Sequence, residues 1–285
     1  MRIFITGGTG FIGKHVVMRL IQGGHAICVL SREENKQEQC SYIKGDMASI
    51  EKWKEKLTAF KPEAMMHLAW EGIPDTSEEM AKKNLQMSLD LLELAGRAGC
   101  ETFLGTGSCL EYGGLKGKVR EEDVGTPPNS LYKAKVELYE KGKERAERLG
   151  IKFIWARPFY VYGPGQKKGS LIPQIIATFK KGEELKLQDP NAANDFVYVQ
   201  DVADALTLLL EKEALAGAYN IGYGRLTSVR NIVQAVAKTM GIPTPKLPPL
   251  GISHPPFFAD TKKIEQATGW KPSTKLEEGI QNMIG

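Results

Sequence analysis

Three glycines near the start of the chain have a spacing that suits phosphate binding. In the segment Thr6-Gly7-Gly8-Thr9-Gly10-Phe11-Ile12-Gly13, a glycine recurs at every third position. Glycines allow a tight turn and a close backbone approach, and the N-terminus of a helix offers N–H donors to an anion. Because an apolar run precedes the segment and a helical pattern follows it, the segment predicts a loop that binds the pyrophosphate of a dinucleotide. The alternative is a turn with a structural role only. The residues expected at the cofactor are Gly7, Gly10, Phe11, Ile12 and Gly13.

The end of the second apolar run bears on which dinucleotide binds. This run, His25–Leu30, leads into Ser31 and Arg32. At this point an enzyme that uses NAD commonly carries Asp or Glu for the ribose 2′-hydroxyl. Arginine can instead hold a 2′-phosphate with two parallel hydrogen bonds. We therefore expect NADP(H), bound by Ser31 and Arg32, with NAD as the alternative if Arg32 is an ordinary surface residue.

The first half of the chain alternates short apolar runs with longer helical patterns. Several runs are apolar on both faces, as buried parallel strands are. This alternation predicts an α/β fold with a doubly wound parallel sheet, the Rossmann arrangement. The predicted strands are Arg2–Thr6, His25–Leu30, Tyr42–Lys44, Ala64–Ala69, Thr102–Gly105 and Lys152–Arg157, and the predicted helices are 11–22, 49–60, 78–98 and 131–149.

The pattern changes after the breaker Gly163-Pro164-Gly165. Shorter elements follow: helices near 170–181, 201–211, 227–240 and 275–284, and strands near 194–199 and 217–221. We expect residues 1–164 to form the dinucleotide-binding domain, with segments near 191–222 returning to it. Residues 165–285 should mainly form a smaller C-terminal substrate lobe.

Composition excludes several classes of protein. The 38 basic and 34 acidic residues are interspersed, so a net charge of +4 does not indicate nucleic-acid binding. The four cysteines form no CxxC pair and the four histidines lie far apart, so neither a metal site nor a disulfide framework is suggested. No apolar stretch approaches the roughly 18 residues of a membrane span. We expect a cytoplasmic protein with free thiols.

Nine segments together resemble the extended short-chain dehydrogenase/reductase family, and within it the NAD-dependent epimerase/dehydratase group that acts on sugar nucleotides. The resemblance covers nearly the whole chain. The matching segments are TGGTGFIG at 6–13, GDM at 45–47, HLAW at 67–70, GTGSCLEYG at 105–113, LYKAK at 131–135, ARPFYVYGPG at 156–165, NDFVYVQDVADA at 194–205, YNIG at 219–222 and GWKP at 269–272.

The resemblance implies further cofactor contacts. Asp46 and Met47 would lie beside the adenine, and the segment from Pro158 to Val161 would approach the nicotinamide carboxamide. The ribose on the nicotinamide side would be lined by Leu68, Ala69 and Trp70. Asp201 would cap the helix that follows it, since Asp is a preferred N-cap residue.

The resemblance also implies a catalytic set of Ser108, Tyr132 and Lys135. Hydride moves between the nicotinamide and a sugar carbon while a proton moves on the adjacent oxygen. Tyrosine has a pKa near 10 and is a poor base at neutral pH, so a lysine ammonium nearby is needed to lower it. Tyr132 would transfer the proton, Lys135 would hold the ribose and tune Tyr132, and Ser108 would bind the reacting oxygen.

The spacing of this set departs from the family pattern Tyr-x-x-x-Lys. Tyr132 and Lys135 are three residues apart, which rotates the lysine by about 100° on a helix. The pair works after a local adjustment, or the lysine contact is weakened, or activity is lost. Tyr139 and Lys143 have the usual spacing but lack the preceding motif, so we interpret them as exposed helix.

Two other departures concern the substrate. Asn194 stands where the family often has an arginine for the substrate diphosphate, which leaves Lys167, Lys168, Arg225 or His254 as candidates. Cys109 and Leu110 stand where dehydratases have an acidic pair, which argues against dehydration. Glu111 follows, and either contacts the sugar or is structural.

These features leave three functions open. The preferred one is an NADPH-dependent reductase of a 4-keto sugar nucleotide, because one binding pose suffices and the diphosphate anchor is in doubt. The alternatives are a sugar-nucleotide 4-epimerase and a catalytically weak NADP-binding protein. We also expect a homodimer through helices 78–98 and 131–149, whose apolar positions are Leu85, Leu89, Leu92, Val136 and Tyr139. The same positions would equally suit a core against the sheet.

Overall fold

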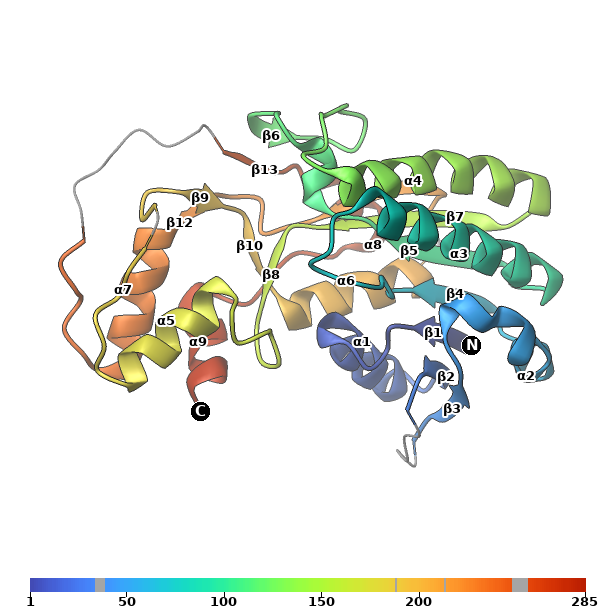
Figure 1. Ribbon diagram of the computed structural model, residues 1–285, viewed down its shortest axis with the longest axis horizontal. Helices are drawn as coiled ribbons and strands as arrows, with labels where there is room; N and C mark the ends of the chain where they lie inside the picture. The colour runs from blue at the N-terminus through green and yellow to red at the C-terminus, as the bar shows by residue number, and fades with distance from the viewer. Residues whose placement is uncertain (34–38, 188, 213, 248–255) are drawn as a thin grey trace.

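The computed structural model describes residues 1–33, 39–187, 189–212, 214–247 and 256–285 (Figure 1). Its centre is a seven-stranded parallel sheet with strand order β11-β7-β5-β4-β1-β2-β3. The strands are β1 (Arg2–Thr6), β2 (Ala26–Ser31), β3 (Ser41–Lys44), β4 (Ala64–His67), β5 (Thr102–Thr106), β7 (Lys152–Pro158) and β11 (Gly217–Ile221). Strand order reverses beside β1, so the predicted doubly wound sheet is confirmed.

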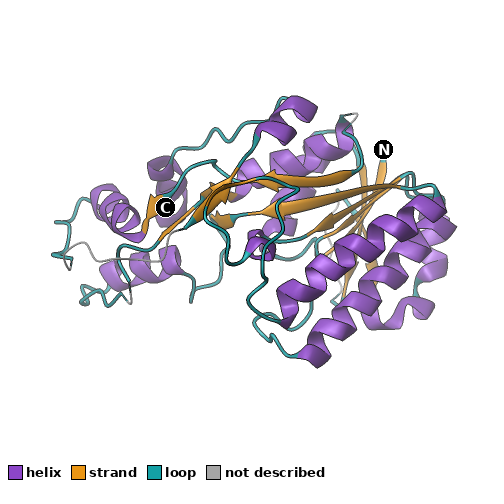
Figure 2. Cartoon of the chain, turned by 90° about the horizontal axis from the view of Figure 1, so that it is seen from above, coloured by secondary structure: helices purple, strands orange, loops and turns teal. Residues whose placement is uncertain are grey.

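Helices cover both faces of this sheet (Figure 2). One face packs against α1 (Phe11–Gln22), α6 (Val199–Glu211) and α8 (Lys262–Thr268). The other packs against α2 (Lys54–Phe60), α3 (Glu78–Arg97) and α4 (Ser130–Leu149). None of the described helices is both long enough and apolar enough to cross a membrane.

A smaller lobe lies beyond the carboxyl edge of the sheet (Figure 1). Its core is formed by three helices and a short parallel strand pair. These are α5 (Leu171–Lys180), α7 (Val229–Met240), α9 (Leu276–Ile284), β8 (Tyr160–Tyr162) and β10 (Phe196–Tyr198). Two further pairs join distant segments: antiparallel β9 (Ala193–Asn194) with β12 (Thr227–Ser228), and parallel β6 (Gly117–Val119) with β13 (Phe257–Ala259).

Two expectations about local structure were wrong. The helix expected over 49–60 is a 3₁₀ segment, Met47–Lys52, followed by α2, because Ser49 is not helical and Trp53 turns its buried ring into the core. The single strand expected near 194–199 is two short strands, and α6 already begins at Val199. The helix α8 and the pair β6–β13 were not predicted.

Asp201 does not cap a helix, because it lies inside the first turn of α6 and is buried. Its carboxylate accepts hydrogen bonds from the backbone N–H and hydroxyl groups of Ser273 and Thr274, at 3.1–3.3 Å. Trp270 donates its indole N–H to the Asp201 carbonyl oxygen at 2.9 Å. Asp201 therefore ties the C-terminal segment to the large sheet.

The leucines proposed for a dimer are core residues. Leu85, Leu89 and Leu92 are buried between α3 and the sheet, and Tyr139 packs on Phe153. Exposed positions of α3 and α4 are instead mostly charged, as at Lys82, Asp90, Glu137 and Lys141. The homodimer stays a prediction, and these leucines do not support it.

Replacing Asp201 with alanine should destabilise the protein by about 2–4 kcal/mol, because four donors lose a buried charged acceptor. Denaturant unfolding followed by circular dichroism measures this change. Asp204→Ala on the same helix is the control, since its ion pair with Arg19 is partly exposed and its loss should cost less than about 1 kcal/mol. Equal losses in the two variants would contradict this role for Asp201.

Candidate active site

The glycine loop packs tightly between β1, β4 and α1. Gly7 has a left-handed φ of +74°, and a Cβ there would lie 2.6 Å from the Ala69 nitrogen. A Cβ on Gly13 would lie 2.0 Å from the Gly7 carbonyl oxygen. Both positions therefore require glycine. α1 begins directly after Gly10, so its first N–H groups face the end of the sheet, as an anion site requires.

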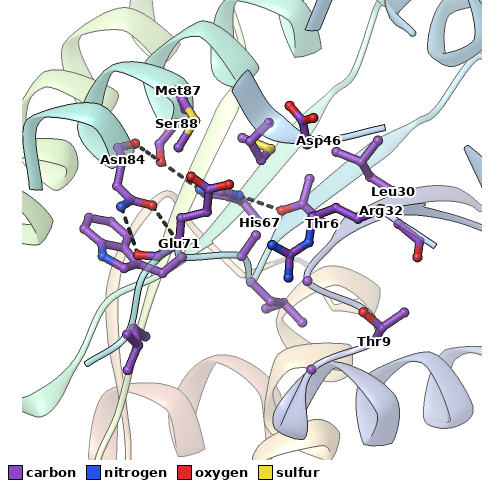
Figure 3. Close-up of a pocket in the computed structure, with 18 of the residues that line it drawn as sticks. Thr6, Thr9, Leu30, Arg32, Asp46, His67, Glu71, Asn84, Met87 and Ser88 are labelled. Atoms are coloured by element: carbon purple, nitrogen blue, oxygen red, sulfur yellow. Dashed lines mark hydrogen bonds between the residues drawn. The ribbon is translucent and has the colours of Figure 1, made fainter. Parts of the chain in front are cut away.

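A cavity of about 490 Å³ opens at the carboxyl ends of β1, β2 and β4 (Figure 3). This size suits a small-molecule ligand. Nine residues expected at the cofactor line it: Gly7, Gly10, Ser31, Arg32, Asp46, Met47, Leu68, Ala69 and Trp70. The expected residues Phe11, Ile12, Gly13, Ser108, Tyr132, Lys135, Pro158 and Val161 lie outside its lining.

Asp46 gives one end of the cavity an acceptor without a partner. The Trp53 indole N–H donates to the Asp46 carbonyl oxygen at 2.8 Å and fixes this turn. Oδ1 of Asp46 is buried, and no described residue bonds to it. An adenine amino group would supply the missing donor. The glycine loop and Asp46 together fit an adenine dinucleotide.

A buried polar chain supports the middle of the cavity (Figure 3). Nδ1 of His67 lies 2.7 Å from the Thr6 hydroxyl, and Nε2 lies 2.8 Å from the Ser88 hydroxyl. Ser88 donates in turn to the Asn84 carbonyl oxygen at 2.7 Å. Burial, with a smaller effect of the Lys135 charge, lowers the pKa of His67 from 6.5 to about 3. His67 is therefore neutral and joins β1, β4 and α3.

Asn84 also holds the loop that follows β4. Its side-chain oxygen accepts the Glu71 N–H at 2.7 Å, and its amide donates to the Glu71 carbonyl oxygen at 3.1 Å (Figure 3). Lys167 reaches the same loop from the smaller lobe and donates to the Ile73 carbonyl oxygen at 3.3 Å. Lys167 therefore lies at the mouth of the cavity.

Ser108 begins a short 3₁₀ segment, Cys109–Tyr112, at the end of β5. Its hydroxyl accepts the Leu110 N–H at 3.2 Å, and its own N–H donates to Glu111 at 2.7 Å. Glu111 is 2% exposed and forms a 2.7 Å ion pair with Arg157. The structural role considered for Glu111 is the one observed.

Lys135 is directed to the carboxyl edge of the sheet despite the short spacing from Tyr132. Its Nζ donates to the Thr106 carbonyl oxygen at 2.8 Å and lies 4.4 Å from the centre of the Trp70 ring. Burial lowers the pKa of Lys135 to about 8, while the Glu111 charge acts in the opposite direction. Lys135 is the member of the set that reaches a cavity-lining residue.

Tyr132 is half-buried in the first turn of α4. Burial raises the pKa of Tyr132, and the neighbouring Cys109 thiol adds to this increase. The lowering that we expected from Lys135 is absent, because the ammonium is turned toward Thr106 and Trp70.

Of the alternative pair two turns further along α4, Tyr139 and Lys143, the tyrosine has a structural role. Tyr139 is not exposed as predicted, because its ring packs on Phe153 and Trp155. Lys143 is exposed and forms an ion pair with Glu140. Neither residue lines the cavity.

The candidate phosphate ligands differ in position. Lys167 lines the cavity, whereas Lys168 is exposed and Arg225 lies 4.5 Å from the centre of the Tyr223 ring. Asn194 belongs to the β9–β12 pair. His254 lies outside the described residues.

Sequence reasoning missed the roles of His67, Asn84 and Ser88. A signal was present: Asn84 and Ser88 are polar residues four apart on the apolar face of a helix, and His67 ends a buried strand. Polar residues in apolar stripes are informative, because burial requires a partner for each of them.

A doubly wound parallel sheet with this loop and this cavity defines a Rossmann-type nucleotide-binding protein. The model of the "NAD dependent epimerase/dehydratase family" matches residues 3–222. The chain belongs to this family, of the extended short-chain dehydrogenase/reductase type.

Individual relatives are distant. The chain is 28% identical to the UDP-glucose 4-epimerase of Mycolicibacterium smegmatis, over 100% of this chain and 97% of that protein. It is equally identical to a trifunctional UDP-glucose 4,6-dehydratase, UDP-4-keto-6-deoxy-D-glucose 3,5-epimerase and UDP-4-keto-L-rhamnose reductase of Arabidopsis thaliana. It aligns over 99% of its own length with that enzyme but spans only about half (46%) of it.

Two solved structures share the fold over all of this chain. The UDP-glucose 4-epimerase of Thermotoga maritima with UDP-glucose is 25% identical, with a TM-score of 0.87 and 97% of that chain covered. MoeE5 in complex with UDP-glucuronic acid and NAD is 26% identical, with a TM-score of 0.85 and 98% covered.

Because His67 is neutral in the folded protein, the free energy of unfolding should decrease as the pH falls. The folded chain resists protonation of His67 down to about pH 3, whereas an unfolded histidine takes up a proton below about pH 6.5. The contribution of neutral His67 to the free energy of unfolding is therefore fully present above pH 6.5 and is lost as the pH falls toward 3. At pH 5 the free energy of unfolding should be lower by about 2 kcal/mol. Urea unfolding from pH 8 to 5 measures the slope. His67→Gln should flatten the slope, whereas His15→Gln should preserve it; an unchanged slope in His67→Gln would contradict the role.

Proposed function

We propose that this protein is an NAD(P)-dependent 4-epimerase of a nucleoside-diphosphate sugar. Two UDP-glucose 4-epimerases that match over nearly their whole length support it, from Mycolicibacterium smegmatis and Thermotoga maritima. They support the epimerase better than the 4-keto reductase that the sequence favoured. The trifunctional relative of Arabidopsis thaliana, whose name includes a reductase activity, is spanned by this chain over about half (46%) of its length.

One observation about the site carries the proposal. Ser108 follows β5, and the Lys135 ammonium donates to the Thr106 carbonyl oxygen at the end of β5, while Glu111, the acidic residue that follows Ser108, is engaged elsewhere. Glu111 is locked to Arg157, Trp155 and the Ser108 N–H, so it does not serve as an acid for elimination. The site thus supports hydride and proton transfer without dehydration.

The roles follow from the chemistry of the side chains. A nicotinamide bound in the cavity would supply hydride transfer at sugar C4. Tyr132 takes the proton of the 4-hydroxyl and later gives it back. Ser108 donates a hydrogen bond to the same oxygen. Lys135 offers its two remaining N–H donors to the cofactor ribose.

Tyr132 needs help to act as a base, because burial raises its pKa. The positive charge of an oxidised nicotinamide, if bound near the phenol, would lower that pKa. Proton transfer by Tyr132 would then depend on the oxidised cofactor.

Incubation with NAD or NADP and a uridine-diphosphate hexose tests the proposal. Both 4-epimers should appear, with no net change in nicotinamide absorbance. Tyr132→Phe should lower the rate by about 10²–10⁴-fold, while Tyr139→Phe stays within a few-fold of wild type. One NADPH consumed for each 4-keto sugar would instead establish the reductase. Cofactor binding without turnover on either substrate would indicate a catalytically silent protein.

Cofactor choice is a second part of the proposal. Ser31 is buried and Arg32 exposed at the rim of the cavity, where a guanidinium suits a 2′-phosphate. We propose a preference for NADP(H), although the related MoeE5 structure contains NAD.

Arg32→Ala should weaken NADPH by about tenfold and NADH by less than about twofold, because only NADPH carries the 2′-phosphate. Calorimetric titration of both dinucleotides measures this. Lys168→Ala, an exposed cation outside the cavity lining, is the control. Wild-type protein that binds NADH as tightly as NADPH would refute the preference.

A further inference from the structure

Trp70 joins the cofactor cavity to Lys135. It follows β4, lines the cavity, and presents the face of its ring to the Lys135 ammonium at 4.4 Å. An indole face is the best of the aromatic partners for a cation, and the attraction grows when the cation is desolvated. Lys135 is desolvated here, with 7% of the residue exposed.

Other polar groups around the ammonium do not replace this contact. The Thr106 carbonyl oxygen accepts one of its three N–H donors. Glu111 is the acidic group whose charge acts on Lys135, but its carboxylate is already held by Arg157 and the Trp155 indole. His67 is neutral. Lys135 is therefore a buried cation whose neighbouring carboxylate is already paired.

Helix geometry explains why such support is needed. Because Lys135 comes three residues after Tyr132, the lysine leaves α4 about 100° from the direction that a four-residue spacing gives. A lysine side chain has four rotatable bonds and loses much entropy when it is held in one place. Something beyond α4 must fix it at the edge of the sheet.

We propose that Trp70 is a positioning residue that holds the Lys135 ammonium at the carboxyl ends of β4 and β5, ready to bind the ribose of the dinucleotide. This inference rests on the proposed function only in assigning Lys135 to the cofactor. The Lys135 ammonium is then held on two sides, by the Thr106 carbonyl oxygen of β5 and by the Trp70 ring in the loop after β4. The two remaining N–H donors are left for ribose hydroxyls.

A double-mutant cycle on cofactor affinity tests the proposal. Calorimetry with NADPH and with NADH is performed on wild type, Trp70→Leu, Lys135→Met and the double variant. Lys135→Met should weaken binding by about tenfold. Trp70→Leu should weaken binding too, and the double variant should lose little more than Lys135→Met. Additive losses, or unchanged affinity in Lys135→Met, would overturn the proposal.

Direct titration of Lys135 gives a second readout. The pKa of Lys135, about 8, can be followed by NMR of the lysine Cε resonance. Loss of the ring face destabilises the cation, so Trp70→Leu should lower this pKa by about one unit. Trp70→Phe keeps a ring and should recover most of the value. The same pKa in wild type and Trp70→Leu would overturn the proposal.

Neither readout involves a sugar, so failure of the epimerase assay and failure of this proposal are separate results. Trp70 is partly exposed, and far-UV circular dichroism checks the fold of each variant. Should Trp70→Leu not fold, Trp70→Met, which also removes the ring face, replaces it in both measurements. A lower pKa of Lys135 in that variant supports the proposal, and an unchanged pKa overturns it.

Discussion

The buried ion pair between Glu111 and Arg157 organises the catalytic edge of the sheet. Glu111 comes from the segment after β5 and Arg157 from the end of β7, and their side chains are 1% and 7% exposed. Arg157 also donates to the Tyr112 hydroxyl and to the Glu121 carbonyl oxygen, at 2.8 and 2.9 Å. Removing one partner of a buried pair leaves a charge without compensation, which costs about 3–5 kcal/mol.

That pair extends into a wider network. Tyr112 donates to Asn220 at the end of β11, and Asn220 donates to the Val119 carbonyl oxygen in β6. Three parts of the chain that are far apart in sequence, residues 108–121, the end of β7 and the end of β11, are thereby fixed relative to one another. Ser108 takes its position from this frame through its N–H bond to Glu111. Ser108, one of the proposed catalytic residues, is thus held by a polar framework at the sheet edge, while the apolar cores lie on the two faces of the sheet.

Local sequence patterns predicted those elements that depend on interactions between residues close together in the chain. The strand, glycine loop and helix at the N-terminus were predicted correctly, because glycine spacing and alternation are read within some twenty residues. Elements that depend on distant partners were not predicted. β6 is a strand only because β13 pairs with it from about 140 residues away. Leu85 and its neighbours could be assigned to the core only once the position of α3 on the sheet was known.

In the site, too, features that depend on local sequence were predicted and features that depend on distant partners were not. Gly7, Gly10, Asp46 and Met47 line the cavity as expected, since they follow strands that end at one edge, whereas Phe11, Ile12 and Gly13 of the same loop do not line it. The direction of Lys135 could not be predicted from its spacing, because a carbonyl oxygen of β5 and a ring after β4 determine it. Tyr139 looked exposed in the helical pattern, but the rings of β7 cover it. Asp201 looked like a cap, but the chain returns some seventy residues later to use it.

The pairing of β13 with β6, and the contact of α8 with the large sheet, have a consequence for synthesis of the protein. The sheet edge at β11 and its cover α8 come from the last third of the chain, although most of the nucleotide-binding domain comes from the first half. A nascent chain that has emerged only as far as β7 exposes one apolar face of the sheet that α6 and α8 later cover. Completion of this domain during translation must therefore wait until α8 has left the ribosome, and a chaperone that shields apolar strands has most to offer during that interval.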